Sequence, residues 1–377
     1  MSFRRLRAVF RKEGLHIIRD PRSLMVALSV PVVMILLFGY ALTLDVDQIP
    51  TVIYDQDHSP ESRALIEEFK GSRFFSVTET LDGHAAIRRG IDHSHTLLGV
   101  VIPGDFSRSL AREREASVQL IIDGSDSNTA SIAAGYAEAL VMSHSAQLRD
   151  AALKHRGLGE LKMPIDARIR VLYNHELKSK NFIIPGIIAV VLMIISALLT
   201  SLTIAREWES GTMEQLLSTP VRPVELLLGK LCAYFVLGMA DVALALVVGV
   251  GVFDVPLRGN VLLLIATSAL FLFGALCWGI FLSTVARSQL LAFQMSIVSS
   301  FLPAFILSGF IFAIENMPVV IQQITRIIPA RYFVTILQGV FLKGTGLQVL
   351  WVEVVFLIVY GAIIFMIASR AMRQKVA

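Results

Sequence analysis

The sequence predicts an α-helical integral membrane protein with six transmembrane helices and an α/β extracytoplasmic domain inserted between helices 1 and 2. Hydrophobic residues make up 55% of the 377 residues, and the mean hydropathy of +0.67 is well above that of a soluble domain. Charged residues make up only 17%, and most acids and seven of the eight histidines fall between residues 45 and 180. One sizeable soluble domain is therefore expected within a membrane protein.

A helix needs about 20 apolar residues to cross a hydrocarbon core of about 30 Å. Six segments qualify as spans, at residues 24–44, 182–204, 228–252, 260–284, 290–313 and 348–369. The first is longer than the core of a cleaved signal, so it is expected to remain as a span. Residues 314–347 are interrupted by prolines and glycines, and we expect outer interfacial helices or a re-entrant hairpin there, because unpaired backbone cannot face lipid.

Lysines and arginines near the span ends predict the orientation. The leader, residues 1–23, holds seven of them, and the tail, residues 370–377, holds three. Both termini are therefore expected in the cytoplasm, with residues 45–181 in the periplasm and the spans in the bacterial inner membrane. The leader has Phe3, Leu6, Val9, Phe10 and Ile17 on one helical face, which favours a basic amphipathic helix on the anionic leaflet. A solvated leader that only fixes topology is the alternative.

The net charge of +4 is explained by these cationic flanks, so no nucleic-acid partner is expected. Both cysteines, Cys232 and Cys277, fall in apolar spans, which excludes a disulfide framework. His93 and His95 could converge on a metal, but too few further ligands stand at ligand spacing, and no metal site is expected. No nucleophile–base set indicates an enzyme.

Alternating strand-like and helix-like runs fill residues 50–178 and predict the α/β domain. The strand-like runs are PTVIYDQD, FFSVTET, HTLLGVVIP, SVQLIID and ARIRVLY. The segment from Asp123 to Thr129 resembles a calcium loop in its acids and hydroxyls, yet the ligand spacing and the bidentate Glu are missing. A turn followed by a helix N-cap explains the same residues.

Residues 205–227 form a polar loop between the second and third spans. Thr212 fits an N-cap with Gln215 three residues later, and Pro223 fits the first position of the next helix. Met213, Leu216 and Leu217 would give the short helix between them an apolar face suited to a groove on a partner. An ordinary helical hairpin loop is the alternative.

Within this loop and its flanks stands REWESGTMEQLLSTPVRPVELLLGK, and elsewhere stand KEGLHIIRDPRSL, DGSDSNTA, FLPAFILSGFIFAIENMP and IIPARYF. Together these motifs resemble the ABC-2 type permeases, the membrane subunits of ABC exporters, and in particular the bacterial drug-efflux permeases of the Ybh type. The resemblance covers essentially the whole chain. One departure is Asp241 in span three, where such permeases are generally apolar.

The resemblance implies a permease that couples ATP hydrolysis by a separate ATP-binding subunit to efflux of amphipathic compounds or drugs. ATP and Mg²⁺ would be bound by that subunit and no cofactor by this chain, which lacks G-x-x-x-x-G-K-[ST]. Further implied partners are a second permease copy or related permease, a periplasmic membrane-fusion adaptor and membrane lipids. The loop 205–227 would be the cytoplasmic coupling helix, with coupling residues Arg206, Glu207, Glu209, Gly211, Thr212, Glu214 and Leu217.

The candidate substrate path comprises Asp241, Gln294, Ser299, Pro303 and Ser308. A charge at the bilayer centre costs at least about 2.5 kcal/mol, so Asp241 is expected to face protein or water. It could contact a cationic substrate, relay a proton, or be neutral and hydrogen-bonded to another span. The small and hydroxylated residues of span five favour close helix approach, with a kink at Pro303.

The outer gate is assigned to Gly309, Pro329, Arg331 and Tyr332, with Arg331 near the headgroups. A non-transporting mechanical coupler acting on periplasmic partners is an alternative function, as is ABC export of lipid, polysaccharide or sodium. A secondary transporter is disfavoured because the sequence shows no inverted repeat.

Overall fold

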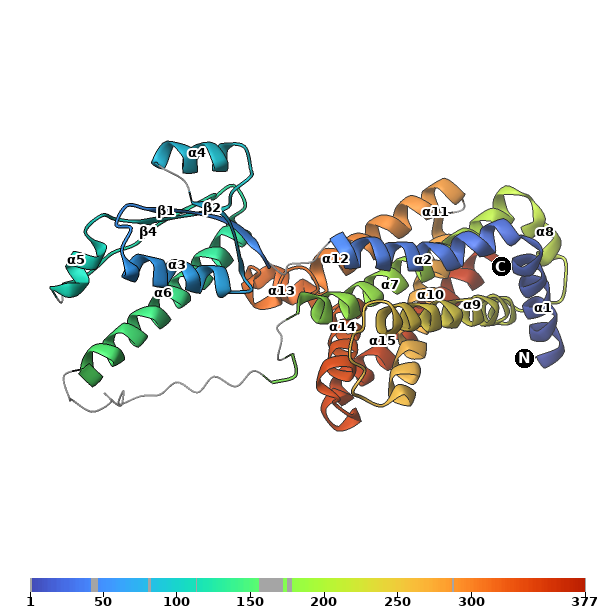
Figure 1. Ribbon diagram of the computed structural model, residues 1–377. Coiled ribbons are helices and arrows are strands. Elements are labelled where there is room, and N and C mark those ends of the chain that lie inside the picture. The colour runs from blue at the N-terminus through green and yellow to red at the C-terminus, as the bar shows by residue number, and fades with distance from the viewer. Residues whose placement is uncertain are drawn as a thin grey trace. The chain divides into compact units, whose positions relative to one another are not determined.

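The computed structural model describes residues 2–41, 47–80, 83–112, 114–155, 172–174, 178–286 and 288–376. The chain divides into two compact units (Figure 1). The larger unit is helical and comprises Met1–Leu44 with Val171–Ala377, and the smaller unit comprises Asp45–Arg170.

The helices of the larger unit follow the hydropathy pattern of the chain. They are α1 Phe3–Arg19, α2 Pro21–Ala41, α7 Ser179–Glu209, α8 Thr212–Leu217, α9 Pro223–Gly251, α10 Val261–Ala286, α11 Gln289–Ser296, α12 Leu302–Leu307, α13 Val319–Thr325, α14 Pro329–Gln338 and α15 Leu347–Val376. Within the described residues, six helical stretches are long and apolar enough to cross a membrane, namely Leu24–Ala41 of α2, α7, α9, α10, Gln289–Leu307 and Leu347–Arg373 of α15.

Helix α7 is the centre of this unit, since α2, α9, α10, α11 and α14 all pack against it. Its closest neighbour is α10, where Gly279 has no room for a Cβ atom beside the Ala197 carbonyl and the Thr200 hydroxyl. The Thr200 hydroxyl donates a hydrogen bond to the carbonyl of Leu276 at 3.0 Å, which joins the two helices within the apolar core. Close backbone approach of this kind is how apolar helices pack in a bilayer.

The fifth span differs from its predicted bounds of 290–313. Helix α11 passes through a π-helical turn, Ile297–Phe301, into α12, which ends at Leu307. Pro303 has no backbone N–H to donate along the helix. The wider π-helical turn immediately before it accommodates this missing hydrogen bond at the predicted kink. Gly309 then takes a left-handed conformation with φ of 82°, which does not continue the helix.

Residues 314–347 form short helices, as predicted, but α14 among them lies in the core and not at the periphery. After a 3₁₀ turn, Ile314–Asn316, and α13, helix α14 enters the core and packs on α7 and α15. Phe333 of α14 stacks on Phe271 of α10, with ring centroids 4.1 Å apart. A π-helical turn, Gly339–Lys343, follows α14 and accepts backbone hydrogen bonds from Arg258 and Gly259.

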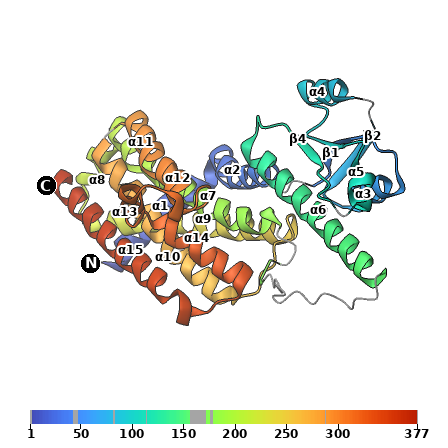
Figure 2. The ribbon, with the colours of Figure 1, turned by 90° about the vertical axis from the view of Figure 1, so that its left-hand side faces the viewer.

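The smaller unit contains a four-stranded sheet flanked by helices. Its elements are β1 Ile49–Asp55, α3 Pro60–Gly71, β2 Phe75–Thr80, α4 His84–Asp92, β3 Leu98–Ile102, α5 Phe106–Ala111, β4 Gln119–Ile122 and α6 Ser127–His155. The strand order is β2-β1-β3-β4, with β1 parallel to β2 and β3, and β4 antiparallel to β3. Helices α3, α5 and α6 cover one sheet face and α4 the other (Figure 2).

Four of the five strand-like runs form strands. The fifth, residues 167–173, lies outside the described residues except for Leu172 and Tyr173, which are not in a strand. The turn and N-cap interpretation of the acidic segment is right, because the Asp126 carboxylate accepts a hydrogen bond from the backbone N–H of Thr129 at the start of α6.

Candidate functional site at one end of the helical bundle

Helices α1 and α8 lie at the same end of the helical unit as both chain termini (Figure 1). Helix α7 continues to Glu209, beyond the predicted end of its span at residue 204, and Gly211 then turns the chain with φ of 70°. Pro223 begins α9 at its first helical position, as predicted. A polar turn and a short helix therefore join the ends of two apolar helices.

Thr212 is not the N-cap that its spacing to Gln215 predicts. Gly211 occupies the cap position of α8, and the Thr212 hydroxyl bonds instead to the Ser210 hydroxyl, 2.9 Å away. The reciprocal carboxylate contact occurs at α9, where Glu225 accepts a hydrogen bond from the backbone N–H of Arg222 at 3.1 Å. The capping-box contact therefore occurs at the start of α9 and not at the start of α8, where the sequence spacing predicts it.

The apolar side of α8 faces this chain's own core. Met213 is only 1% exposed and packs in a cluster with Val9 of α1, Ile204 of α7 and Leu227 of α9, and Leu216 packs against the same cluster. The side chain of Leu217 lies outside the described part of the structure. Met213 therefore packs within this chain and does not face a partner, and the described side chains that α8 exposes are Thr212, Glu214 and Gln215.

Beneath α8 lies a network of four charged side chains from α1, α7 and α9, of which Glu13, Glu207 and Lys230 are buried and Lys12 is exposed. The Lys230 ammonium of α9 is 1% exposed, and it lies 2.9 Å from Glu13 Oε1 and 3.0 Å from Glu207 Oε1. Lys12 completes the network at 2.7 Å from Glu207 Oε1 and 3.4 Å from Glu13 Oε1. The buried part holds one ammonium group and two carboxylates, and the exposed Lys12 supplies the second positive charge that balances the network joining the three helices.

The charges of this network shift the titration of its α1 members. Burial by itself would raise the pKa of Glu13, but the ammonium groups of Lys230 and Lys12 outweigh it and hold that pKa below its usual value. Burial would lower the pKa of Lys12, yet Glu207 and Glu13 raise it above its usual value. Each partner therefore stabilises the charged form of the other.

Two further carboxylates, those of Glu225 and Glu209, hold the starts of neighbouring helices near this network. The Glu225 carboxylate, 1% exposed, accepts a hydrogen bond of 2.6 Å from the backbone nitrogen of Ser2, which ties the chain start to α9. Glu209 at the end of α7 accepts a hydrogen bond of 2.8 Å from the backbone N–H of Gln289, the first residue of α11. Both carboxylates satisfy N–H groups at helix starts, which have no intrahelical partner.

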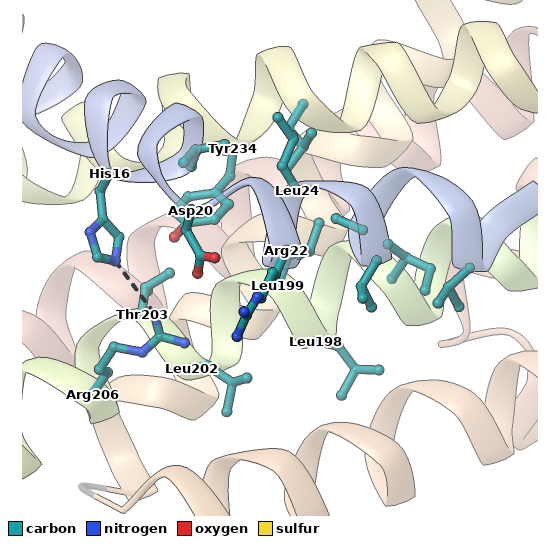
Figure 3. A pocket seen from close by; sticks show the side chains of 16 residues that line it. His16, Asp20, Arg22, Leu24, Leu198, Leu199, Leu202, Thr203, Arg206 and Tyr234 are labelled. Carbon is teal, nitrogen blue, oxygen red and sulfur yellow. Dashed lines mark hydrogen bonds between the residues drawn. The ribbon is translucent and has the colours of Figure 1, made fainter.

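Two cavities open beside the network and share the lining residues His16, Thr203, Arg206 and Tyr234. The first, of about 380 Å³, contains the charged network and the Gln215 side of α8. The second, of about 440 Å³, runs between α2 and α7 and is lined mainly by aliphatic side chains, including Leu198, Leu199 and Leu202 (Figure 3). We call this second cavity the α2–α7 pocket.

The α2–α7 pocket has a polar mouth. His16, Asp20, Arg22 and Arg206 gather at one end of it, and an Arg206 N–H points at His16 Nε2, 3.4 Å away (Figure 3). Ile195 lies eleven residues before Arg206 on α7, so the pocket extends about 16 Å along that helix. An aliphatic channel with a charged entrance suits a molecule with one polar and one apolar end.

The predicted coupling residues fall into two groups. Glu207 is 7% exposed and points into the network, so it does not present a surface to a partner. Arg206, Glu209, Gly211, Thr212 and Glu214 are exposed at the bundle end. Within the described residues the exposed Glu214 carboxylate has no hydrogen bond or ion pair to another element, so it is accessible to another protein.

The residues assigned to a substrate path are dispersed. Ser299 accepts a hydrogen bond from the Trp278 indole at 3.1 Å and Ser308 accepts one from the Phe310 backbone at 3.3 Å, so both hold local structure. Gln294 is exposed and Pro303 half-buried. Asp241 is 1% exposed, and among the described residues its Oδ1 atom has no hydrogen-bond partner. None of these side chains lines the α2–α7 pocket.

The residues assigned to an outer gate lie around α13 and α14. The Arg331 guanidinium donates to the Thr325 hydroxyl at 2.6 Å, and the Tyr332 hydroxyl donates to the Arg326 carbonyl at 2.9 Å. The Tyr332 ring also stacks on Phe356 of α15 at 3.7 Å. Pro329 begins α14 and is buried, and Gly309 makes the turn after α12. These contacts fasten α13 and α14 to the bundle.

Sequence reasoning missed Glu13 and Lys230 as site residues. Glu13 is in the polar leader and Lys230 is near the start of an apolar span, and charged side chains at such positions are usually exposed. A signal was present, since Val9 and Glu13 are four residues apart and share one face of the leader helix. A carboxylate on the buried face of an amphipathic helix requires a cationic partner.

The chain is similar to known transport proteins over nearly its full length. It matches the family described as ABC-2 family transporter protein over residues 21–370. The chain belongs to the ABC-2 transporter family. This ABC-2 permease is 39% identical over 360 residues to the Escherichia coli K12 protein named "Probable multidrug ABC transporter permease YbhS", covering 95% of this chain and 94% of that one.

Two further Escherichia coli K12 relatives support the assignment. The protein named "Probable multidrug ABC transporter permease YbhR" is 32% identical over 99% of this permease and its own full length. "Inner membrane transport permease YhhJ" is 27% identical over 87% of this permease and 86% of its own length. The resemblance inferred from the sequence motifs is confirmed, and the permease is a multi-pass membrane protein.

Replacing Lys230 with Met should lower the free energy of unfolding by about 3–5 kcal/mol, because it leaves Glu13 and Glu207 buried with too little positive charge. Thermal unfolding of the purified permease in detergent would measure this. Lys343→Met, the same change at an exposed lysine, should have little effect. Adding Glu13→Gln to Lys230→Met should restore part of the loss. Equal melting temperatures for Lys230→Met and Lys343→Met would contradict the network's role.

The depressed pKa of Glu13 predicts a pH-dependent contribution to stability. The contribution is fully present above the usual carboxyl pKa of 4.5 and is lost as the pH falls through the lower pKa of the folded state. The difference in melting temperature between the unchanged permease and Glu13→Gln should therefore be constant from about pH 7 to pH 5 and narrow below that. A difference that widens on acidification would show that Glu13 is not stabilised as a carboxylate.

Proposed function

We propose that this permease is the membrane subunit of an ATP-driven exporter of amphipathic compounds, drugs among them. A separate ATP-binding subunit would bind ATP and Mg²⁺ and hydrolyse ATP, since the chain itself carries no G-x-x-x-x-G-K-[ST] motif. Membership of the ABC-2 family and the multidrug names of two relatives support the proposal. The observation that carries it is an aliphatic pocket with a charged mouth, which shares His16, Thr203, Arg206 and Tyr234 with the cavity lined by α8.

The proposed coupling route starts at the exposed side of α8. A nucleotide-driven partner would bind Glu214 and its polar neighbours, while the buried side of α8 is fixed to α1, α7 and α9 through Met213. Lys230 and Glu207 then join α9 to α7 at the level of this helix. A force on α8 would consequently move α7 together with α9, and not α8 alone.

Movement of α7 would alter the α2–α7 pocket, because α7 forms one of its walls. Leu198, Leu199 and Leu202 are on α7, whereas Leu24, Ala27 and Val30 face them from α2. An amphipathic molecule would place its apolar part between these walls and its polar part near Arg22 and Arg206. Displacing one wall weakens the binding of the apolar part and favours release.

The same proposal includes the orientation of the subunit in the membrane and its protein partners. The end with α1, α8 and both termini would face the cytoplasm, and the sheet-containing unit would lie in the periplasm, with the helices in the bacterial inner membrane. A second permease copy or a related permease would complete the translocation path. A periplasmic adaptor is a further proposed partner. The folded unit of residues 45–170 also suits a mechanical coupler, which would stimulate ATP hydrolysis without efflux.

Glu214→Arg should weaken binding of the ATP-binding subunit about fivefold, because it reverses one charge at an exposed contact. Stimulation of ATP hydrolysis by the reconstituted permease should fall, with the melting temperature unchanged. Glu138→Arg, on the exposed surface of α6, serves as the matched control. Full ATPase stimulation by Glu214→Arg would exclude α8 as the contact.

Leu202→Trp should reduce ATP-dependent efflux of an amphipathic fluorescent dye from vesicles about fivefold or more, because filling the pocket costs about 1 kcal/mol or more of dye binding. ATPase stimulation should persist, since α8 is unchanged. Leu262→Trp, at a 73% exposed position of α10, is the matched control. Efflux at the unchanged rate would exclude the pocket from the path, and no efflux by the unchanged complex would favour the mechanical coupler.

A further inference from the structure

A third cavity lies beside α1 and borders the α2–α7 pocket, with which it shares the lining residues Ile17, Leu24 and Leu237. It is an open groove of about 450 Å³ between α1, α2 and α9. We call it the α1 groove, and its lining consists of Phe10, Arg11, Gly14, Leu15, Ile17, Ile18, Leu24, Leu28, Ala233, Val236, Leu237 and Ala240. Apart from Arg11, every lining residue is apolar or glycine.

The α1 groove is hollow because small residues face it. Gly14 on α1 has no other atom within 4 Å of where a Cβ would stand, and Ala233 and Ala240 on α9 leave space on the opposite wall. Larger apolar side chains form the rim, with Ile18 68% and Val236 62% exposed. Apolar surface left open in this way in a membrane protein is covered by lipid or by another chain.

The depth of the groove matches one leaflet. From Ala233 to Ala240 the groove follows α9 for seven residues, which is about 10 Å of helix. The hydrocarbon core is about 30 Å thick, so the groove is shorter than the half that belongs to one leaflet. Its apolar part therefore has the extent of part of a single acyl chain.

The positive charge of Arg11 in the α1 groove favours a ligand with an anionic group. Arg11 is the one charged side chain in the lining, and it is exposed. Arg4, Arg7 and Arg19 are also exposed on α1, whereas the acid of that helix, Glu13, is buried and paired with Lys230 within the described structure. The surface of α1 is thus positive, and each such cation near a bilayer attracts anionic lipid by about 1 kcal/mol.

We propose that the α1 groove is a binding site for an anionic phospholipid of the leaflet at the α1 end. One acyl chain occupies the groove between α1, α2 and α9, and the phosphate lies at Arg11. The acyl chain fills the space on one side of α1. On the other side, Val9 packs on Gly229 and Glu13 pairs with Lys230, which holds α1 to α9. The lipid thereby supports the same α1–α9 contact as the charged network.

The test uses the purified full-length permease in phosphatidylcholine bilayers containing a small amount of phosphatidylglycerol with a photoactivatable group in its acyl chain. Labelled peptides are identified by mass spectrometry. Labelling should concentrate on the groove segments of α9 and α2 around Val236 and Leu28. A phosphatidylcholine probe with the same photoactivatable chain should label these segments about fivefold less, because its headgroup carries no net charge.

Two pairs of variants separate the groove from general lipid contact. Gly14→Leu fills the groove and raises the helix propensity of α1, so it should abolish labelling without unfolding the helix. Gly135→Leu, at an exposed helical glycine of α6 with open space, is its control. Arg11→Gln should reduce phosphatidylglycerol labelling about fivefold to the phosphatidylcholine level, whereas Arg4→Gln, outside the groove, should reduce it much less.

Three outcomes would overturn the proposal. Undiminished labelling of Gly14→Leu would show that lipid does not enter the groove. Equal labelling by both probes in the unchanged permease would exclude an anionic headgroup. Crosslinking of a Val236→Cys variant to a second copy, in place of lipid labelling, would show that a protein covers the groove.

Discussion

The buried ammonium group of Lys230 is the constraint on which the end of the helical bundle depends. A lysine that is 1% exposed is unstable unless carboxylates lie beside it, and these come from α1 and α7, far from α9 in sequence. Three helices must therefore meet at this point at once. The position of α8, the two cavities beside the network and the groove under α1 all follow from this meeting.

The same constraint changes the meaning of the polar loop between α7 and α9. Glu207 is held inward by Lys230, and Met213 is held inward by the apolar cluster, whereas Thr212, Glu214 and Gln215 of α8 are exposed. A helix fixed from below can pass a force to the helices that hold it. Since α7 packs against most of the other helices, the proposed displacement at α8 would act on the whole unit.

Local patterns predicted the elements well where the determining interaction lies within the element. The six apolar stretches became long helices, Pro223 began α9, and Asp126 capped α6. Predictions failed where a neighbouring glycine sets a helix boundary. Thr212 has the spacing of a cap, but Gly211 occupies the cap position, and the fifth span ends at Leu307, just before Gly309 takes a left-handed conformation. Met213, predicted on a partner-facing apolar face of α8, instead packs within the bundle.

The sequence by itself determined that the chain is a membrane protein of the ABC-2 family with a sheet-containing insertion, because hydropathy and motifs are properties of consecutive residues. Tertiary structure decided which charges are paired and which surfaces are open. Glu13, Glu207 and Lys230 are separated by up to 217 positions, and only packing brings their side chains within 3.0 Å of one another's charges. Cavities likewise form between helices, so no single segment encodes them.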